Sequence, residues 1–276
     1  MTRRKVLVTG AAGGMGRACA RLFGATHDLV LTDASARLTL VAEELEADAY
    51  TVRAARTGDL GDTALLDALV ADLGSGEPVT ILHTAGLSPS QADWRSILSV
   101  NLVATEKLLA AVEPILAPGS VVVAIASTAG HVPIEIPGTA DLLKAPLDTA
   151  FLDTIGAIIE AAAGGNAAGA SGLAYLLSKR AVLRLVERKA VAWGAKGARI
   201  VSISPGLILT PMGRQEVEQT PGAAETRDAA PAGRPGTAMD IALAARFLAS
   251  DSATFITGTD LRVDGGTTAA MLSMAG

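Results

Sequence analysis

Residues 5–16 read KVLVTGAAGGMG, and this stretch decides the fold that the remaining chain completes. Its first part, Lys5–Thr9, is a short aliphatic run typical of a buried strand. Glycines follow at once and permit a tight turn, and we expect a helix to begin near Met15. The backbone N–H groups of such a turn can approach a phosphate group. Taken alone, the cluster is also compatible with a tight turn that binds nothing. The residues predicted to hold the phosphates are Gly10, Gly14, Met15 and Gly16.

Beyond this stretch, short β-branched runs alternate with longer Ala- and Leu-rich stretches at helical spacing. Such alternation predicts parallel strands joined by right-handed crossovers. We therefore predict an α/β fold, Rossmann-like and doubly wound, with a seven-stranded parallel sheet, helices on both faces and a single domain over residues 1–276. The predicted strands are Lys5–Thr9, Asp28–Thr32, Ala49–Arg53, Val79–Thr84, Ser120–Ala126, Arg199–Ser204 and Asp260–Val263. The predicted helices include Asp62–Leu73, Asp93–Leu116, Gly172–Trp193 and Ala238–Leu248.

Two segments interrupt this alternation. Residues 130–172 read as an insertion with a helical pattern of its own, in which Phe151, Ile155, Ile158, Ile159 and Ala162 share one face. Asp148 or Thr149 is expected to cap this helix, and Gly164-Gly165 to end it. Residues 211–235 are rich in Pro, Gly, Ala and Glu, with little periodicity, and predict a mobile surface loop over the substrate.

The composition limits the classes of partner. Half of the residues are hydrophobic but only 3% are aromatic, so the core must consist of Ala, Val, Leu and Ile. A net charge of −5, a pI near 5.3 and the lack of a basic run argue against nucleic-acid binding. The single cysteine, Cys19, excludes an internal disulfide, indicates a reducing compartment and is interpreted as a buried thiol. No apolar run is long enough for a signal peptide or a membrane span, so we expect a soluble, cytoplasmic protein without membrane contact.

Tyr175 and Lys179 stand four residues apart in LAYLLSKRAV, which places both side chains on one face of a helix. A neighbouring ammonium favours the phenolate and lowers a tyrosine pKa that is otherwise about 10. Ser127 lies upstream at the end of an apolar run. A phosphate-binding turn together with an acidified tyrosine indicates a nicotinamide-dependent oxidoreductase.

Acidic residues after the second and third strands bear on the cofactor. Asp33 can accept hydrogen bonds from ribose hydroxyls and would repel a 2′-phosphate, which predicts NAD rather than NADP. The alternative is that Asp33 only caps the helix that follows it. Arg17 and Arg37 are close enough in sequence to leave NADP open. Asp59, followed by Leu60, is expected to reach the adenine.

Small residues and histidines complete the candidate site. Ala85 and Gly86 follow the fourth strand and would leave room for a cofactor above the strand ends. The three histidines, His27, His83 and His131, share no ligand-like spacing with one another or with the cysteine, so we predict no metal site.

Together these pieces resemble the short-chain dehydrogenase/reductase family of the one-domain type, over essentially the whole chain. Each piece is short, but their order and spacing are specific. One departure is His83-Thr84, where the family more often has two asparagines, and we expect it to weaken a structural turn and not the chemistry. The long insertion and the Ala192-Trp193-Gly194 helix end further resemble bacterial 3α-hydroxysteroid dehydrogenase/carbonyl reductases. The matching pieces are Thr9–Gly16, Ala85-Gly86, Val100-Asn101, Ser127, Tyr175 with Lys179, Pro205-Gly206 and Asp264-Gly265-Gly266.

The resemblance implies a role for each matching residue. Tyr175 would be the general acid in ketone reduction and the base in alcohol oxidation. Lys179 would lower the pKa of Tyr175 and hold the nicotinamide ribose, and Ser127 would hydrogen-bond the substrate oxygen. Asn101, on a long helix, would hold a water that links Lys179 to solvent. The residues implied at the nicotinamide end are Pro205, Gly206 and Thr210.

Other functions remain open. Gly10, Gly13 and Gly16 also match the epimerase and dehydratase branch, but few residues follow the Lys179 helix to build its extra substrate domain. A regulatory protein that binds the cofactor without turnover is the non-enzymatic alternative, although it would be expected to lack Tyr175 or Lys179.

The apolar composition of Leu142–Ile159 and Leu207–Leu209, which are expected to border the site, predicts a hydrophobic ketone or secondary alcohol, steroid-like or aromatic. A polar substrate such as a sugar or an acyl-thioester is the alternative. Because 47 residues separate Ser127 from Tyr175, the insertion should obstruct part of the helix packing through which the family assembles. We therefore expect a homodimer, with a tetramer as the alternative.

Overall fold

The computed structural model of the chain describes residues 3–219 and 230–275. Within these residues, seven strands form one fully parallel sheet in the order β3-β2-β1-β4-β5-β6-β7, which confirms the predicted α/β class. The strand order reverses between β1 and β4, where doubly wound sheets bind their ligands. The strands are β1 Lys5–Thr9, β2 Asp28–Asp33, β3 Val52–Thr57, β4 Val79–His83, β5 Val121–Ile125, β6 Arg199–Pro205 and β7 Asp260–Val263.

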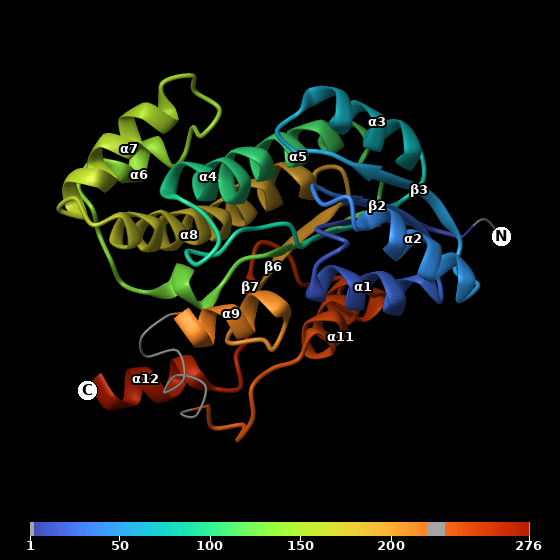
Figure 1. Ribbon diagram of the computed structural model, residues 1–276. Coiled ribbons are helices and arrows are strands. Elements are labelled where there is room, and N and C mark those ends of the chain that lie inside the picture. Colours follow the sequence, from blue (N-terminus) through green and yellow to red (C-terminus); the bar gives the residue numbers. More distant parts are fainter. Residues whose placement is uncertain (1–2, 220–229, 276) are drawn as a thin grey trace.

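Helices cover both faces of the sheet (Figure 1). Val6 and Val8 of β1 point into a core shared with α1, α2 and α11, whereas Leu7 points into the opposite core with α3, α5 and α8. This division follows from the two-residue period of a strand. The helices are α1 Gly14–Gly24, α2 Leu38–Ala47, α3 Thr63–Leu73, α4 Trp94–Leu98, α5 Ala104–Val112, α6 Thr139–Leu142, α7 Phe151–Ala162, α8 Ala167–Gly194, α9 Pro211–Gln219, α11 Ala238–Ala249 and α12 Thr267–Ala275. Short 3-10 turns span Glu113–Ile115, Thr128–His131 and Asp251–Ala253.

The third strand begins three residues later than predicted. Ala49 has a left-handed backbone with φ of 63° because it follows the end of α2. The N–H of Ala49 donates to the Glu46 carbonyl, and the N–H of Tyr50 donates to the Leu45 carbonyl, which is the Schellman pattern of a helix end. Residues 49–51 are therefore part of the helix-to-strand turn. The predicted strand Ala49–Arg53 was wrong at its start and also ended four residues early, because β3 continues to Thr57.

Two predicted helices have different limits. The helix predicted at Asp93–Leu116 is α4, a π-helical turn at Ser99–Val103 and α5 in succession. The helix that carries Tyr175 begins at Ala167 and not at Gly172, because the Asn166 side chain accepts from the Gly169 N–H and caps it.

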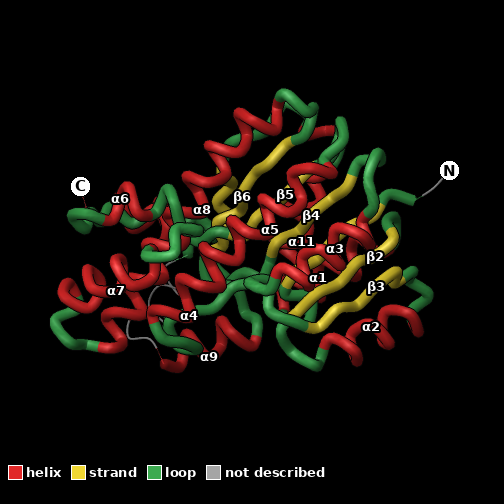
Figure 2. Tube along the Cα trace, turned by 90° about the horizontal axis from the view of Figure 1, so that it is seen from above, coloured by secondary structure: helices red, strands yellow, loops and turns green. Residues whose placement is uncertain are grey.

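The insertion folds onto α4 and α8. Phe151, Ile155 and Ile159 of α7 are buried in a third apolar cluster with residues of both helices, as the predicted face requires, whereas Ala162 is exposed. The Asp148 side chain accepts from the Ala150 N–H just before the helix begins. The N-cap residue of α7 is Ala150, however, and no side chain caps the helix, so the expected cap at Asp148 or Thr149 was wrong. In both views α6 and α7 lie at the side of the molecule away from β2 and β3 (Figures 1 and 2).

The segment predicted as a mobile loop, residues 211–235, contains helix α9 over Pro211–Gln219, so the prediction of an unstructured loop was wrong there. Residues 220–229 lie outside the described residues. Residues 230–235 return beside the end of β7, where the Ala232 N–H donates to the Gly265 carbonyl.

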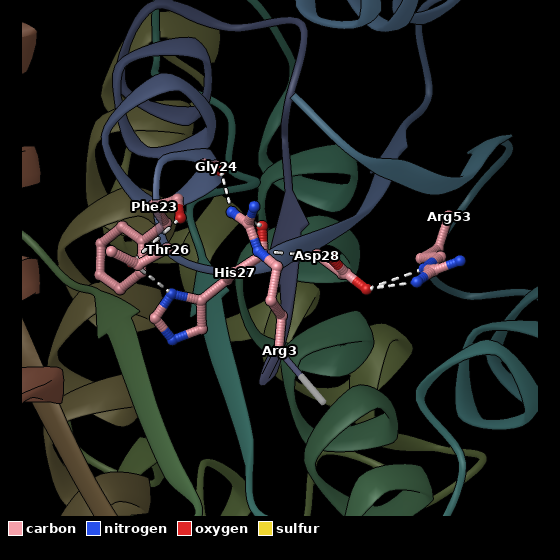
Figure 3. Close-up of polar contacts among 7 residues, drawn as sticks. All are labelled: Arg3, Phe23, Gly24, Thr26, His27, Asp28 and Arg53. Carbon is pink, nitrogen blue, oxygen red and sulfur yellow. Dashed lines mark hydrogen bonds and ion pairs between the residues drawn. The ribbon is translucent and has the colours of Figure 1, made fainter. Parts of the chain in front are cut away.

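At the amino ends of the strands, charged groups join neighbouring segments (Figure 3). The buried Asp28 carboxylate contacts Arg53 at 2.7 Å and Arg3 at 3.5 Å, and Arg3 also donates to the Gly24 carbonyl at 2.6 Å. Burial lowers the pKa of the neighbouring His27. This network stabilises the amino ends of the strands, which lie opposite to the candidate site at their carboxyl ends.

Cys19 is fully buried in α1, and burial raises the pKa of its thiol to about 12, in agreement with the interpretation as a core residue. Among residues 3–219 and 230–275, no helix combines the length and hydropathy that a membrane span requires.

Candidate active site

The turn between β1 and α1 leaves no space for side chains. Gly10 has a φ of +64°, and a Cβ there would lie 2.8 Å from the Ala85 nitrogen. A Cβ at Gly16 would lie 2.1 Å from the Gly10 carbonyl oxygen, far inside van der Waals contact. No side chain caps α1, whose N-cap residue is Gly13. The helix start therefore keeps N–H groups available for an anion, and the turn fits the pyrophosphate of a dinucleotide.

Asp33 ends β2 beside this turn. One carboxylate oxygen accepts from the Ala12 N–H at 2.9 Å and the other from the Ser35 N–H at 2.8 Å. Asp33 is not the cap of α2, which begins later, at Leu38. Arg17 forms an ion pair with Glu44, so its guanidinium already has a partner.

Asp59 and Leu60 follow β3 away from the cavity that contains Tyr175. The Asp59 carboxylate accepts from the Gly61 N–H at 2.7 Å, and Leu60 is buried in the core. Asp62 caps α3 through the Ala64 N–H. Asp59 and Leu60 lie beyond the carboxyl end of β3, on the side expected for the adenine, and do not line the cavity that contains Tyr175.

A cavity of about 640 Å³ opens at the carboxyl ends of the central strands. Eight of the predicted site residues line it, together with apolar residues from α9 and α12. Asn101 and Ala85 do not line it, although Asn101 bonds the backbone of Leu87, which does. The eight residues are Met15, Gly86, Ser127, Tyr175, Lys179, Pro205, Gly206 and Thr210.

Tyr175 and Lys179 share one face of α8, as the four-residue spacing predicts. The Lys179 Nζ lies 5.7 Å from the centre of the Tyr175 ring and donates to the Ile125 carbonyl at 3.0 Å. Burial lowers the pKa of Lys179 to about 8, because the charged ammonium loses solvation. A Cβ at Gly86 would lie only 3.5 Å from Nζ, so a small residue there leaves room for the ammonium.

Asn101 occupies the middle of the π-helical turn and not a regular long helix. Its side chain is buried and bonds the Leu87 backbone at both ends: Oδ1 accepts from the N–H at 2.8 Å and Nδ2 donates to the carbonyl at 3.0 Å. Its own carbonyl accepts from the Thr105 hydroxyl at 2.8 Å. In this structure Asn101 therefore fixes the loop after β4, which borders the cavity. π-helical turns of this kind are frequent at functional sites.

Ser127 begins a short turn that forms one wall of the cavity. Its hydroxyl accepts from the Ala129 N–H at 3.1 Å. A Cβ at Gly130 would lie 2.9 Å from the Lys179 backbone, so this turn packs directly on α8. His131 ties the turn to β6 and β7, with Nε2 3.2 Å from the Ser204 hydroxyl and 3.0 Å from the Asp260 carboxylate.

His83 holds the turn in which the family more often has asparagines. The buried ring bridges two hydroxyls, with Nδ1 2.8 Å from Thr9 and Nε2 2.8 Å from Thr105. Burial, together with the nearby Lys179 charge, lowers the pKa of His83 to about 3, so the ring is neutral at pH 7. Thr84 donates to the Thr9 carbonyl at 2.7 Å. His83 and Thr84 thus hold this turn through hydrogen bonds to Thr9 and Thr105, and the expected weakening relative to the family stays a prediction.

The loop after β6 lies against the glycine-rich turn. A Cβ at Gly14 would lie 2.6 Å from the Thr210 side chain, and one at Gly206 would lie 2.8 Å from Asp264. Thr210 therefore lies beside the glycine-rich turn, and Pro205, Gly206 and Thr210 line the same cavity as Met15.

The apolar walls of the cavity differ from those predicted. Leu207 and Ile208 line it, but none of Leu142–Ile159 does, because the insertion packs on α4 and α8 instead. The missed lining residues include Met212 of α9 and Met271 and Leu272 of α12. No local sequence signal marks them, because their helices approach the site only through the tertiary fold.

The described part of the chain contains no group of three or more His, Cys, Asp or Glu side chains that could hold a metal ion.

Comparison with known proteins agrees with this geometry. The profile described as short chain dehydrogenase matches residues 4–140, and that described as Enoyl-(Acyl carrier protein) reductase matches residues 134–268. The chain is 31% identical to D-threitol dehydrogenase from Mycolicibacterium smegmatis, with 95% of this chain and 92% of that protein covered. The chain belongs to the short-chain dehydrogenase/reductase family. Its members include Short-chain dehydrogenase/reductase bsc3 from Alternaria brassicicola, which is 29% identical, with 95% of each chain covered.

A solved structure shares the same architecture. The 3-alpha-hydroxysteroid dehydrogenase from Pseudomonas sp. B-0831, complexed with NADH, is 26% identical, with a TM-score of 0.75 and 98% of each chain covered. The short-chain dehydrogenase/reductase described here is accordingly an oxidoreductase that acts on CH–OH groups and uses NAD(P).

Proposed function

We propose that this short-chain dehydrogenase/reductase transfers a hydride between NAD(H) and a hydrophobic ketone or secondary alcohol, with Tyr175 as the general acid and base. The observation that carries the proposal is the cavity in which Ser127, Tyr175 and the buried Lys179 meet next to the glycine-rich turn.

Each residue has a defined task in ketone reduction. The nicotinamide, when bound, supplies the hydride that reaches the carbonyl carbon. The Ser127 hydroxyl donates a hydrogen bond to the substrate oxygen as negative charge develops on it. Tyr175 gives its phenolic proton to that oxygen, and in alcohol oxidation it takes the proton back. The Lys179 ammonium stabilises the phenolate left behind and binds the nicotinamide ribose.

Asn101 has a supporting task in this scheme. Its side chain fixes the Leu87 backbone beside the cavity, and Gly86 lies between its amide and the Lys179 ammonium. We propose that this arrangement holds the water through which Lys179 exchanges protons with solvent.

NAD is the proposed cofactor. Asp33 stands at the end of β2 beside the glycine-rich turn, where its negative charge would repel a 2′-phosphate. Arg17 forms an ion pair with Glu44, which competes with a 2′-phosphate for its guanidinium, and Arg37 keeps NADP as the alternative cofactor. Asp59 and Leu60 are proposed at the adenine, and Ala85, Gly86, Pro205, Gly206 and Thr210 along the nicotinamide half. A higher kcat/KM with NADPH than with NADH would contradict this assignment.

The apolar cavity wall supports a hydrophobic substrate, steroid-like or aromatic. Leu207, Ile208, Met212 and Val132 all line it. A polar substrate is the second candidate, because the D-threitol dehydrogenase to which the chain is similar acts on a sugar alcohol.

Substitution of Tyr175 by Phe tests the function directly. We expect kcat to fall by about 10³-fold or more, within the range of general acid–base catalysis, while the Kd for NADH changes less than about twofold. The measurement is a panel of hydrophobic ketones and sugar alcohols followed at 340 nm with each cofactor. Near-normal turnover in this variant would exclude the assigned role.

Assembly and location are proposed on the same basis. Residues 1–276 are proposed to act as one domain in the cytoplasm. Because α7 covers part of α4 and α8, pairing through these helices is obstructed, which supports a homodimer over a tetramer. Light scattering that gives four subunits would contradict the dimer.

A further inference from the structure

The last described helix returns over the candidate active site. Four residues of α12 line the cavity that contains Tyr175 and Ser127: Thr267, Thr268, Met271 and Leu272. In Figure 1, α9 and α12 are both drawn below the sheet, and residues of both helices line this cavity. This part of the wall is far from the glycine-rich turn along the chain, since α12 begins at Thr267, 251 residues after Gly16.

The start of α12 is fixed by backbone geometry. Gly265 and Gly266 both have positive φ, of 64° and 85°, and reverse the chain after β7. The Asp264 carboxylate accepts from the N–H groups of Gly266 and Thr268, each at 3.0 Å. The Thr267 hydroxyl donates to the Asp264 carbonyl at 2.8 Å. These bonds determine where the following turns of the helix point.

Two large apolar residues of α12 take no part in the described cores. Neither Met271 nor Leu272 packs in any of the three apolar clusters of the described residues, and their exposed fractions are 44% and 62%. Met212 of α9 also lines the cavity. Exposed apolar surface next to a cavity gains free energy when a ligand covers it.

We propose that Met271 and Leu272 form a specificity-determining wall that selects extended, multi-ring apolar carbonyl compounds. The inference rests on the proposed function, because it takes Tyr175 as the point where the carbonyl binds. Two polar groups of the cavity, Ser127 and Tyr175, hold the carbonyl end of the substrate. The apolar body then extends to α12, where it covers surface that the fold itself leaves exposed.

This arrangement distinguishes substrates by length. A single-ring ketone that reaches Tyr175 leaves Met271 and Leu272 uncovered and gains nothing from them. A four-ring ketone covers both side chains. Flexible Met side chains adapt to different ring shapes. The wall therefore selects for the length of the apolar part of the substrate more than for its exact shape.

The test is the double variant Met271→Ala with Leu272→Ala. Kinetics are measured with NADH and cyclohexanone, 2-decalone or 5α-androstane-3,17-dione. Binding of the androstanedione to the protein saturated with NAD⁺ is measured by calorimetry. Leu40→Ala on α2 is the matched control, since Leu40 is 60% exposed and does not line the cavity. A thermal melt checks that each variant is folded.

We expect KM and Kd for the androstanedione to rise roughly tenfold in the double variant, while KM for cyclohexanone changes less than about twofold and the control is unchanged. Equal values for the androstanedione in wild type and double variant, or no binding to the wild type, would overturn the proposal. If the androstanedione binds more weakly to the double variant but no ketone is reduced by the wild type, the proposed function fails and the role of α12 stands.

Discussion

Two regions of the molecule are rich in glycine, and they tolerate side chains very differently. In the turn between β1 and α1, a Cβ at Gly16 would lie 2.1 Å from a backbone oxygen. In the region around the start of α8, a Cβ at Gly172 would meet no atom within 4 Å. Gly164 and Gly165 also face open space, and only their positive φ of 59° and 81° disfavours a side chain there. Both regions are thus rich in glycine, but backbone contacts exclude a side chain only in the turn between β1 and α1. The cofactor end is fixed by backbone contact, whereas the insertion end is held by side-chain packing.

The largest effect is expected from Gly16→Ala. The methyl group collides with the Gly10 carbonyl, so the turn must open and lose its fit to the pyrophosphate. We expect the Kd for NADH to rise more than about 100-fold, with a loss of stability of several kcal/mol. Calorimetry and urea unfolding measure both quantities.

Gly172→Ala is the matched control in α8. It should leave the Kd for NADH unchanged and raise the free energy of unfolding by about 0.5–1 kcal/mol, because Ala favours a helix over Gly. Equal losses of NADH affinity and of stability in Gly16→Ala and Gly172→Ala would show that the two regions do not differ in their tolerance of a side chain.

His83→Asn tests the acid sensitivity of the cofactor end. The folded pKa of His83 is about 3, below the ordinary value of 6.5, so the unfolded chain binds more protons between these values. The stability that neutral His83 contributes is therefore complete above pH 6.5 and is lost as the pH falls toward 3. We expect the wild type to lose roughly 2–4 kcal/mol more than the variant over this window.

The measurement for His83→Asn is urea unfolding of both proteins from pH 7 to pH 4. If the free energy of unfolding depends on pH in the same way in both proteins, protonation of His83 does not cause the loss of stability in acid.

Gly156→Ala probes the packing that holds the insertion. A Cβ at Gly156 would lie 2.2 Å from the Trp94 ring, which also donates to Glu160 at 2.9 Å. Overpacking should lower the free energy of unfolding by about 1–3 kcal/mol, while kcat/KM for a small ketone stays constant because α7 does not line the cavity.

Gly169→Ala is the control for Gly156→Ala, since its Cβ would lie 3.4 Å from the nearest atom. A large change in kcat/KM for Gly156→Ala would instead place the insertion in the catalytic machinery.

The smallest effect is expected from Ala49→Gly. Ala49 has a φ of 63°, which a Cβ disfavours and glycine adopts freely. The change should raise the free energy of unfolding by about 0.5–1 kcal/mol, whereas Ala47→Gly inside α2 should lower it by a similar amount. Thermal melts compare the two. A lower Tm for Ala49→Gly would show that the turn gains nothing from a glycine.

Much of the fold was predictable because local patterns encode it. Six of the seven predicted strands agree with the structure within two residues, and the four-residue spacing of Tyr175 and Lys179 placed both on one face of α8. The third strand was misplaced because a non-glycine residue, Ala49, takes the left-handed position that usually signals a helix end. The π-helical turn at Asn101 carries no periodic signature, so a regular helix was predicted.

By itself, the sequence determined the order of strands and helices along the chain and the glycine-rich turn. It also determined the residues that meet at the carboxyl ends of the central strands. These features depend on side-chain period and backbone sterics over a few residues. Only the tertiary structure decided that the insertion covers α4 and α8 and that α12 supplies the apolar cavity wall. The physical reason is that an apolar side chain gains free energy against any apolar partner. Which partner it meets depends on how distant segments pack, and no local pattern records that choice.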